Sequence, residues 1–183
     1  MLIPSLESRT TKWPIFIILL DTNTLFSKTA KLITNQPYNH VSISFTRDFE
    51  QLYTFSLKPS TSNKSLFGGF MIENKEKFKH ANYALYSVYT KEYEYRIIHD
   101  TIDNLIKNIK ETKYNILNLI DIILNTKWSK NTSIANQICS TFIVELFKLA
   151  NIELLDSQGK IVKPYDLVNS NLINFLESGI IKN

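Results

Sequence analysis

One cysteine and one of the three histidines stand where they could act together as a nucleophile and a base. Cys139 lies in "NQICSTFIVELF", where the apolar spacing predicts a helix that begins at or just before it. At a helix start, unpaired backbone N–H groups and the helix dipole favour an anion, so we expect a reactive thiolate. The same N–H groups would stabilise an oxyanion. This position therefore indicates acyl transfer through a cysteine.

His40 is the candidate base. It begins "HVSISF", whose alternation of large apolar and small polar residues predicts a strand. Ser42 and Ser44 share strand parity with His40, and their small side chains would let a helix pack closely on that face. We therefore expect His40 to face the helix of Cys139 and to act as its general base. The alternative is an inert buried cysteine and a surface histidine at a strand edge.

The composition is that of an ordinary globular protein. Of the 183 residues, 44% are hydrophobic and 21% are charged, which suits one domain over 1–183, with 1–12 as a loose N-terminal segment. The net charge of +4 comes mostly from lysines spread in ones and twos, so no nucleic-acid partner is expected. A single cysteine excludes an internal disulfide, and no metal-ligand spacing or phosphate loop predicts a cofactor.

No targeting segment is expected. The apolar run "WPIFIILL" lacks a basic region before it and a small-residue cleavage site after it. It is also shorter than the roughly 20 residues that span a bilayer. We interpret it as a strand covered on both faces, and we expect a cytoplasmic protein without a transmembrane segment.

The remaining patterns predict an α+β fold, with a small antiparallel sheet packed against helices. Alternating or continuous apolar runs predict strands, helical spacing predicts helices, and the pair Gly68-Gly69 predicts a bend or a close backbone approach. The expected strands cover residues 15–20, 41–45, 52–57 and 83–89, the last part (172–181) is a strand or a helix, and the expected helices cover 25–33, 95–109, 116–123 and 138–149.

Several motifs together resemble a known family. "YNHVSISF", "LYTFSL", "GGF", "YN" at 114–115, "CSTFIVELF" and "KPYDL" occur in the order found in circularly permuted NlpC-type cysteine hydrolases of the papain-like superfamily. In that group the histidine strand precedes the cysteine helix, and lecithin retinol acyltransferase and its bacterial and viral relatives share this order. The resemblance covers residues 15–176. It implies a permuted papain-like fold with the cysteine at a helix N-terminus.

The resemblance also implies roles for particular residues. Cys139 matches the nucleophile and His40 the base. The family usually adds a third polar residue on the next strand to orient the imidazole, and Thr54 and Ser56 are the candidates in "YTFSL". A hydroxyl orients an imidazole less strongly than a carboxylate does, and Glu73 is a more distant candidate.

The implied function is a thiol hydrolase, a peptidase or amidase that acts through an acyl-enzyme. A lipid or other acyltransferase of the same fold, and a non-catalytic binding module that keeps the fold, are the alternatives. Tyr38, just before the histidine strand, is a candidate for the oxyanion or substrate site or for packing. The expected partner is a peptide, an amide or a lipid-ester substrate.

Overall fold

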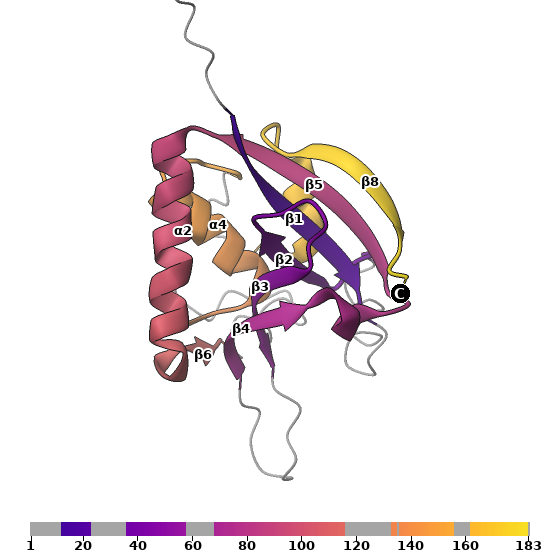
Figure 1. Cartoon of the computed structure of the whole chain (residues 1–183), viewed down its shortest axis with the longest axis horizontal. Coiled ribbons are helices and arrows are strands. Elements are labelled where there is room, and N and C mark those ends of the chain that lie inside the picture. The colour runs from indigo at the N-terminus through magenta and orange to yellow at the C-terminus, as the bar shows by residue number, and fades with distance from the viewer. Residues whose placement is uncertain are drawn as a thin grey trace, which may run out of the picture.

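The described part of the chain forms a six-stranded sheet in the order β4-β3-β2-β1-β5-β8 (Figure 1). The computed structural model describes residues 12–22, 36–57, 68–115, 133–134, 136–155 and 162–182. Every neighbouring pair of strands in this sheet is antiparallel. The strands are β1 (Trp13–Asp21), β2 (His40–Ser44), β3 (Gln51–Leu57), β4 (Gly68–Asn74), β5 (Asn82–Thr90) and β8 (Asn174–Ile180).

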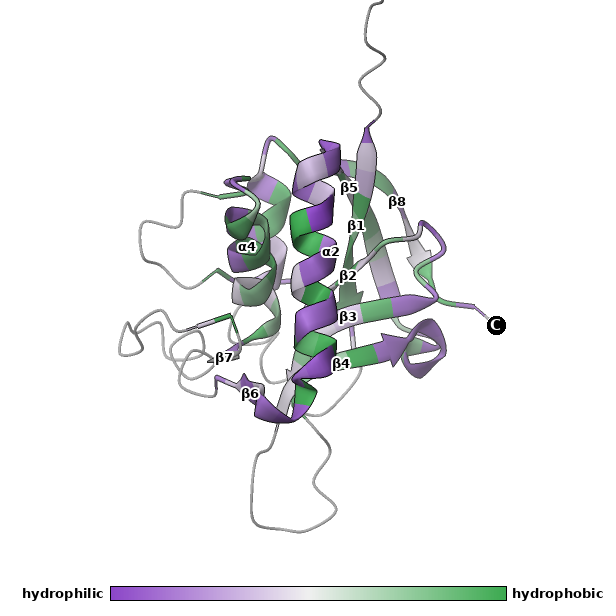
Figure 2. Cartoon of the chain, turned by 60° about the vertical axis from the view of Figure 1, so that its left-hand side comes forward, coloured by the Kyte–Doolittle hydropathy of each residue, from purple (hydrophilic) through white to green (hydrophobic). Residues whose placement is uncertain are grey.

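Two helices lie next to each other on one side of this sheet (Figure 1). They are α2 (Glu92–Lys107) and α4 (Cys139–Leu149). Figure 2 shows hydrophilic and hydrophobic residues along α2, and its buried stripe includes Ile98, Ile102 and Leu105. The predicted α+β class with an antiparallel sheet is therefore confirmed.

Short elements complete the described chain. Three 3₁₀ turns are η1 (Lys75–Phe78), η2 (Ile109–Glu111) and η3 (Pro164–Asn169), and a parallel two-stranded pair consists of β6 (Lys113–Tyr114) and β7 (Asn136–Gln137). Residues 172–181, expected to be a strand or a helix, contain the edge strand β8. Among the described residues, no helix is long and apolar enough to cross a membrane.

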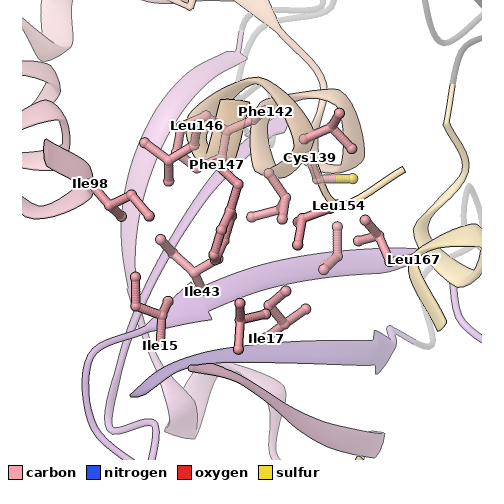
Figure 3. Packing of buried hydrophobic residues seen from close by; sticks show 14 of the residues in the cluster. Ile15, Ile17, Ile43, Ile98, Cys139, Phe142, Leu146, Phe147, Leu154 and Leu167 are labelled. Carbon is pink, nitrogen blue, oxygen red and sulfur yellow. The ribbon is translucent and has the colours of Figure 1, made fainter. Parts of the chain in front are cut away.

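Strand β1 lies inside the sheet and is covered on both faces, as predicted from its continuous apolar run. Ile15, Ile17 and Leu19 belong to the cluster between the sheet and the two helices, which we call the helix-side cluster. Figure 3 shows Phe147 of α4 pointing into it. Phe16, Ile18 and Leu20 belong to a second cluster on the other face, with Phe49, Leu52, Phe78, Ala81, Leu85 and Ile181; we call this the far-side cluster.

The pair Gly68-Gly69 allows β4 to pass close to β6, which confirms the predicted close backbone approach. A Cβ on Gly68 would lie 2.5 Å from the carbonyl oxygen of Ser56 and 2.7 Å from Cβ of Tyr114. A Cβ on Gly69 would lie 2.6 Å from the hydroxyl of Thr112, which itself accepts a hydrogen bond from the backbone N–H of Phe70. These contacts leave no space for a side chain at either glycine.

Some expected elements lie outside the described residues. These are the helices at 25–33 and 116–123, the loop that follows β3, and the N-terminal segment 1–12 apart from its last residue.

Candidate functional site

His40 begins β2, a strand that is buried along its whole length. It pairs with Leu20 of β1. Directly paired residues in an antiparallel sheet project to the same face, so His40 lies on the face of the far-side cluster. Its ring stacks on Phe78 of that cluster, with the ring centroids 5.9 Å apart. The imidazole is thus held between the sheet and the turn η1.

The prediction that His40 faces the helix of Cys139 is therefore wrong. Val41 and Ile43 have the opposite parity, and they pack with Cys139 of α4 in the helix-side cluster. The sequence correctly predicted that β2 has one face with large and one face with small side chains. Both faces are buried, however, and α4 covers the face with the large side chains, not the face with the small ones.

Cys139 is the first residue of α4, and its side chain is 6% exposed. Two neighbours hold the start of this helix in place. The Ser140 hydroxyl donates to the carbonyl oxygen of Val162 at 2.6 Å, and the Thr141 hydroxyl accepts from the backbone N–H of Ile138 at 3.2 Å. The thiol lies at the margin of the helix-side cluster, near Leu154 and Leu167 in Figure 3.

The cysteine reaches the backbone of β2 directly beside His40. A backbone hydrogen bond joins its sulfur to Val41. The carbonyl oxygen of Val41 accepts a hydrogen bond from the Thr54 hydroxyl at 2.8 Å, while β2 and β3 pair further along at Ile43. Cys139 thus contacts the residue that follows His40, from the other face of the sheet. Among the described residues, no hydrogen bond joins the thiol to the imidazole.

Burial decides the charge of both groups. Burial raises the pKa of the Cys139 thiol to about 11, although hydrogen bonds from the backbones of Val41, Ser140 and Cys139 and from the Ser140 hydroxyl act in the opposite direction. Burial also lowers the pKa of His40; Glu73 opposes this change and Lys77 adds to it. At neutral pH the pair is a thiol and a neutral imidazole. The expectation of a stabilised thiolate at the helix start is therefore wrong for this structure.

Glu73 of β4 is the carboxylate that faces His40. It pairs with Leu52 of β3, which places it on the face of the far-side cluster. Its Oε2 lies 3.9 Å from Nε2 of His40, and its side chain is 3% exposed. This oxygen is buried, and it has no hydrogen-bond partner among the described residues. A small movement of either side chain would close the gap to a charge-assisted hydrogen bond, which is shorter than 3 Å.

The sequence had ranked Glu73 behind Thr54 and Ser56. The hydroxyl of Thr54 donates to the backbone oxygens of Val41 and Phe55, and in the described chain no hydrogen bond connects Thr54 or Ser56 to His40. The sequence patterns did not predict the strand β4 that carries Glu73. The one signal for this residue was an acidic side chain directly after the apolar run in "GGFMIE".

Tyr38 lies on the helix side of the sheet. It is half-buried and packs against the helix-side cluster that contains Cys139, and its ring centroid is 6.0 Å from that of Tyr165. Burial raises the pKa of its hydroxyl, and Tyr165 and Asp21 add to this effect. Tyr38 is thus grouped with the cysteine rather than with the histidine.

The fold and the site together define an α+β protein with a buried cysteine, histidine and glutamate around one end of β2. No protein-family model matches the chain, and no curated protein matches it.

Proposed function

We propose that the protein is a cysteine hydrolase or acyltransferase with a permuted papain-like fold. In this proposal Cys139, at the N-terminus of α4, is the nucleophile, His40 is its base and Glu73 orients the base. One observation carries the proposal: the sulfur is hydrogen-bonded to the residue that follows His40, while the imidazole faces a buried carboxylate oxygen that no other described residue hydrogen-bonds.

The neutral state of both groups determines how the proton would move. Because the resting thiol is protonated, the proton must leave during the attack, as it does for a hydroxyl nucleophile. Nε2 of His40 faces Glu73, which leaves Nδ1 to accept that proton. The imidazole and the thiol lie on opposite faces of the sheet, so the proposal requires the His40 side chain to turn around the end of β2, where this strand begins, toward the thiol.

The proposed reaction proceeds through an acyl thioester on Cys139. Sulfur bonds to the carbonyl carbon of an amide or ester, and Nδ1 takes the thiol proton. The C–N or C–O bond breaks, the leaving amine or alcohol takes the proton back from the imidazolium, and an acyl thioester remains on Cys139. Water then releases a carboxylic acid, or another acceptor takes the acyl group; the first outcome defines a hydrolase and the second an acyltransferase. Tyr38, on the same side of the sheet as the thiol, would contact the acyl group.

The test uses small acyl donors and the mass of the intact protein. 4-Nitrophenyl acetate, 4-nitrophenyl palmitate and an acylated peptide amide are incubated with the native protein, Cys139→Ser and His40→Asn. We expect an acyl adduct on Cys139 in the native protein, and a rate at least about 100-fold lower in His40→Asn because a general base is lost. His80→Asn is the matched control, because His80 is exposed and its positive φ of 68° is one that asparagine tolerates.

Equal rates in the native protein and both site variants would contradict this proposal. So would an adduct that forms equally well in His40→Asn and His80→Asn, because the base would then have no role.

A non-catalytic binding module is the second candidate, and one observation favours it. A thiol whose pKa is about 11 is about 99.99% protonated at pH 7, which suits a structural cysteine. This candidate predicts no acyl adduct on Cys139 with any donor.

A further inference from the structure

Lys77 is the cation beside the buried carboxylate of Glu73. It lies in η1, four residues after Glu73, and its ammonium forms an ion pair with Oε1 of Glu73. The two side chains differ in exposure, with Lys77 at 48% and Glu73 at 3%. An almost completely buried carboxylate needs such a partner, because removing an isolated charge from water is costly.

The two oxygens of Glu73 have different neighbours. Oε1 is bound by Lys77, whereas Oε2 is directed at Nε2 of His40 and has no hydrogen-bond partner in the part of the chain that the structure describes. A carboxylate held through one oxygen keeps the direction of the other. Lys77 thus contacts the oxygen of Glu73 that does not face His40.

We propose that Lys77 is a positioning residue for His40: it holds Glu73 by one oxygen so that the other faces the imidazole, and through Glu73 it sets the protonation of that imidazole. The catalytic part of this inference rests on the proposed function. The electrostatic part concerns the resting protein alone and does not depend on turnover.

The groups around His40 come from four elements. β4 contributes the Glu73 carboxylate, and η1 contributes the Lys77 ammonium and the Phe78 ring. β2 contributes the Ser42 hydroxyl, which lies 3.4 Å from Nε2, and α4 contributes the neutral thiol on the other side of the sheet. Glu73 raises the pKa of His40, and Lys77 lowers it by direct repulsion, so a loss of positioning and a loss of repulsion would move this pKa in opposite directions.

The experiment follows the imidazole signals of all three histidines by NMR during a pH titration. In Glu73→Gln we expect the pKa of His40 to fall, and in Lys77→Gln we expect it to fall as well, because a misdirected Glu73 no longer raises it. A rise in Lys77→Gln would show that only the direct repulsion by Lys77 had been removed. Lys77→Arg keeps the cation and should restore the native value. Lys79→Gln, the control, removes an exposed positive charge two residues away. His80 and His99 act as internal references in each sample.

The double variant separates positioning from simple repulsion. If Lys77 acts through Glu73, Lys77→Gln in the Glu73→Gln background shifts the pKa of His40 by a different amount than it does in the native background. An equal shift in both backgrounds would show direct repulsion and overturn the inference. An unchanged His40 in Lys77→Gln, or an equal shift in Lys79→Gln, would overturn it as well.

Acyl transfer provides the second readout. With a misdirected Glu73, Lys77→Gln should transfer acyl groups about tenfold more slowly, and the acid limb of its pH–rate profile should move to lower pH. Lys77→Arg should recover both the rate and the profile. If the native protein forms no acyl adduct but the pKa of His40 shifts in the variants as expected, the proposed function fails and the positioning of Glu73 by Lys77 stands. If adducts form but the pKa of His40 does not shift in this way, the proposed function stands and the positioning role of Lys77 fails.

Discussion

The raised pKa of Cys139 predicts how slowly its thiol is alkylated in the folded protein. Its pKa is raised from 9.0 to about 11, mainly by burial. Well below pH 9, the thiolate fraction is therefore about one hundredth of that of an unperturbed thiol, since each pKa unit is a factor of ten. Because the thiolate is the form that reacts, we expect iodoacetamide to modify native Cys139 about 100-fold more slowly than the same cysteine in the urea-unfolded chain at pH 8.

The same shift links folding to pH. The folded protein holds the thiol proton between about pH 9 and 11 while the unfolded chain releases it, so the folded state binds more protons and the free energy of unfolding falls as pH rises. The contribution is fully present below about pH 9 and is lost through about pH 11. Between pH 8.5 and 10.5 the loss is about 2 kcal/mol, from about 1.4 kcal/mol per pKa unit.

Urea denaturation with a reductant measures this loss in the native protein and in Cys139→Ser. The difference between the two isolates the thiol, because tyrosines with raised pKa values, such as Tyr114, are present in both proteins. The serine variant should lose about 2 kcal/mol less between these pH values. An alkylation midpoint at or below about pH 8.5 in the native protein would refute the reasoning, and it would show that the thiol proton is already transferred at rest.

Three further predictions follow from burial and packing. The pKa of His40 is lowered by burial, so the unfolded chain binds its proton first and the native protein should lose stability as pH falls below about 6.5; His40→Gln should lose less in the same urea assay. Gly69→Ala should destabilise by about 1–3 kcal/mol, because its Cβ would meet Thr112, whereas Gly179→Ala, with its nearest neighbour at 3.3 Å, should change unfolding much less. Phe147→Ala, at the fully buried centre of the helix-side cluster, should cost about 3–5 kcal/mol in thermal or urea unfolding.

Sequence patterns predicted the elements of this fold better than their mutual arrangement. The apolar run of β1 predicted a strand covered on both faces, and two clusters cover it. The apolar spacing in "NQICSTFIVELF" predicted the helix α4, whose buried residues include Phe142 and Leu146. Such periodicities are local properties of the chain, and they depend on burial alone.

The position of Glu73 could not be predicted in this way. Its approach to His40 depends on the register of β3 against β4, where Leu52 pairs with Glu73. A shift of one residue would turn Glu73 to the other face of the sheet. No pattern within β4 determines that register, which is set by the pairing of two strands.

The face of His40 has a more general consequence for the site. Had the imidazole shared a face with Cys139, the helix dipole and the base would act on the thiol from one side. Instead, the thiol meets the backbone of Val41 from the helix side, while Glu73 and Lys77 meet the imidazole from the other. The pKa of each residue is therefore set by its own surroundings. A substitution on the face of the far-side cluster, such as Lys77→Gln, should change the pKa of His40 without changing that of Cys139.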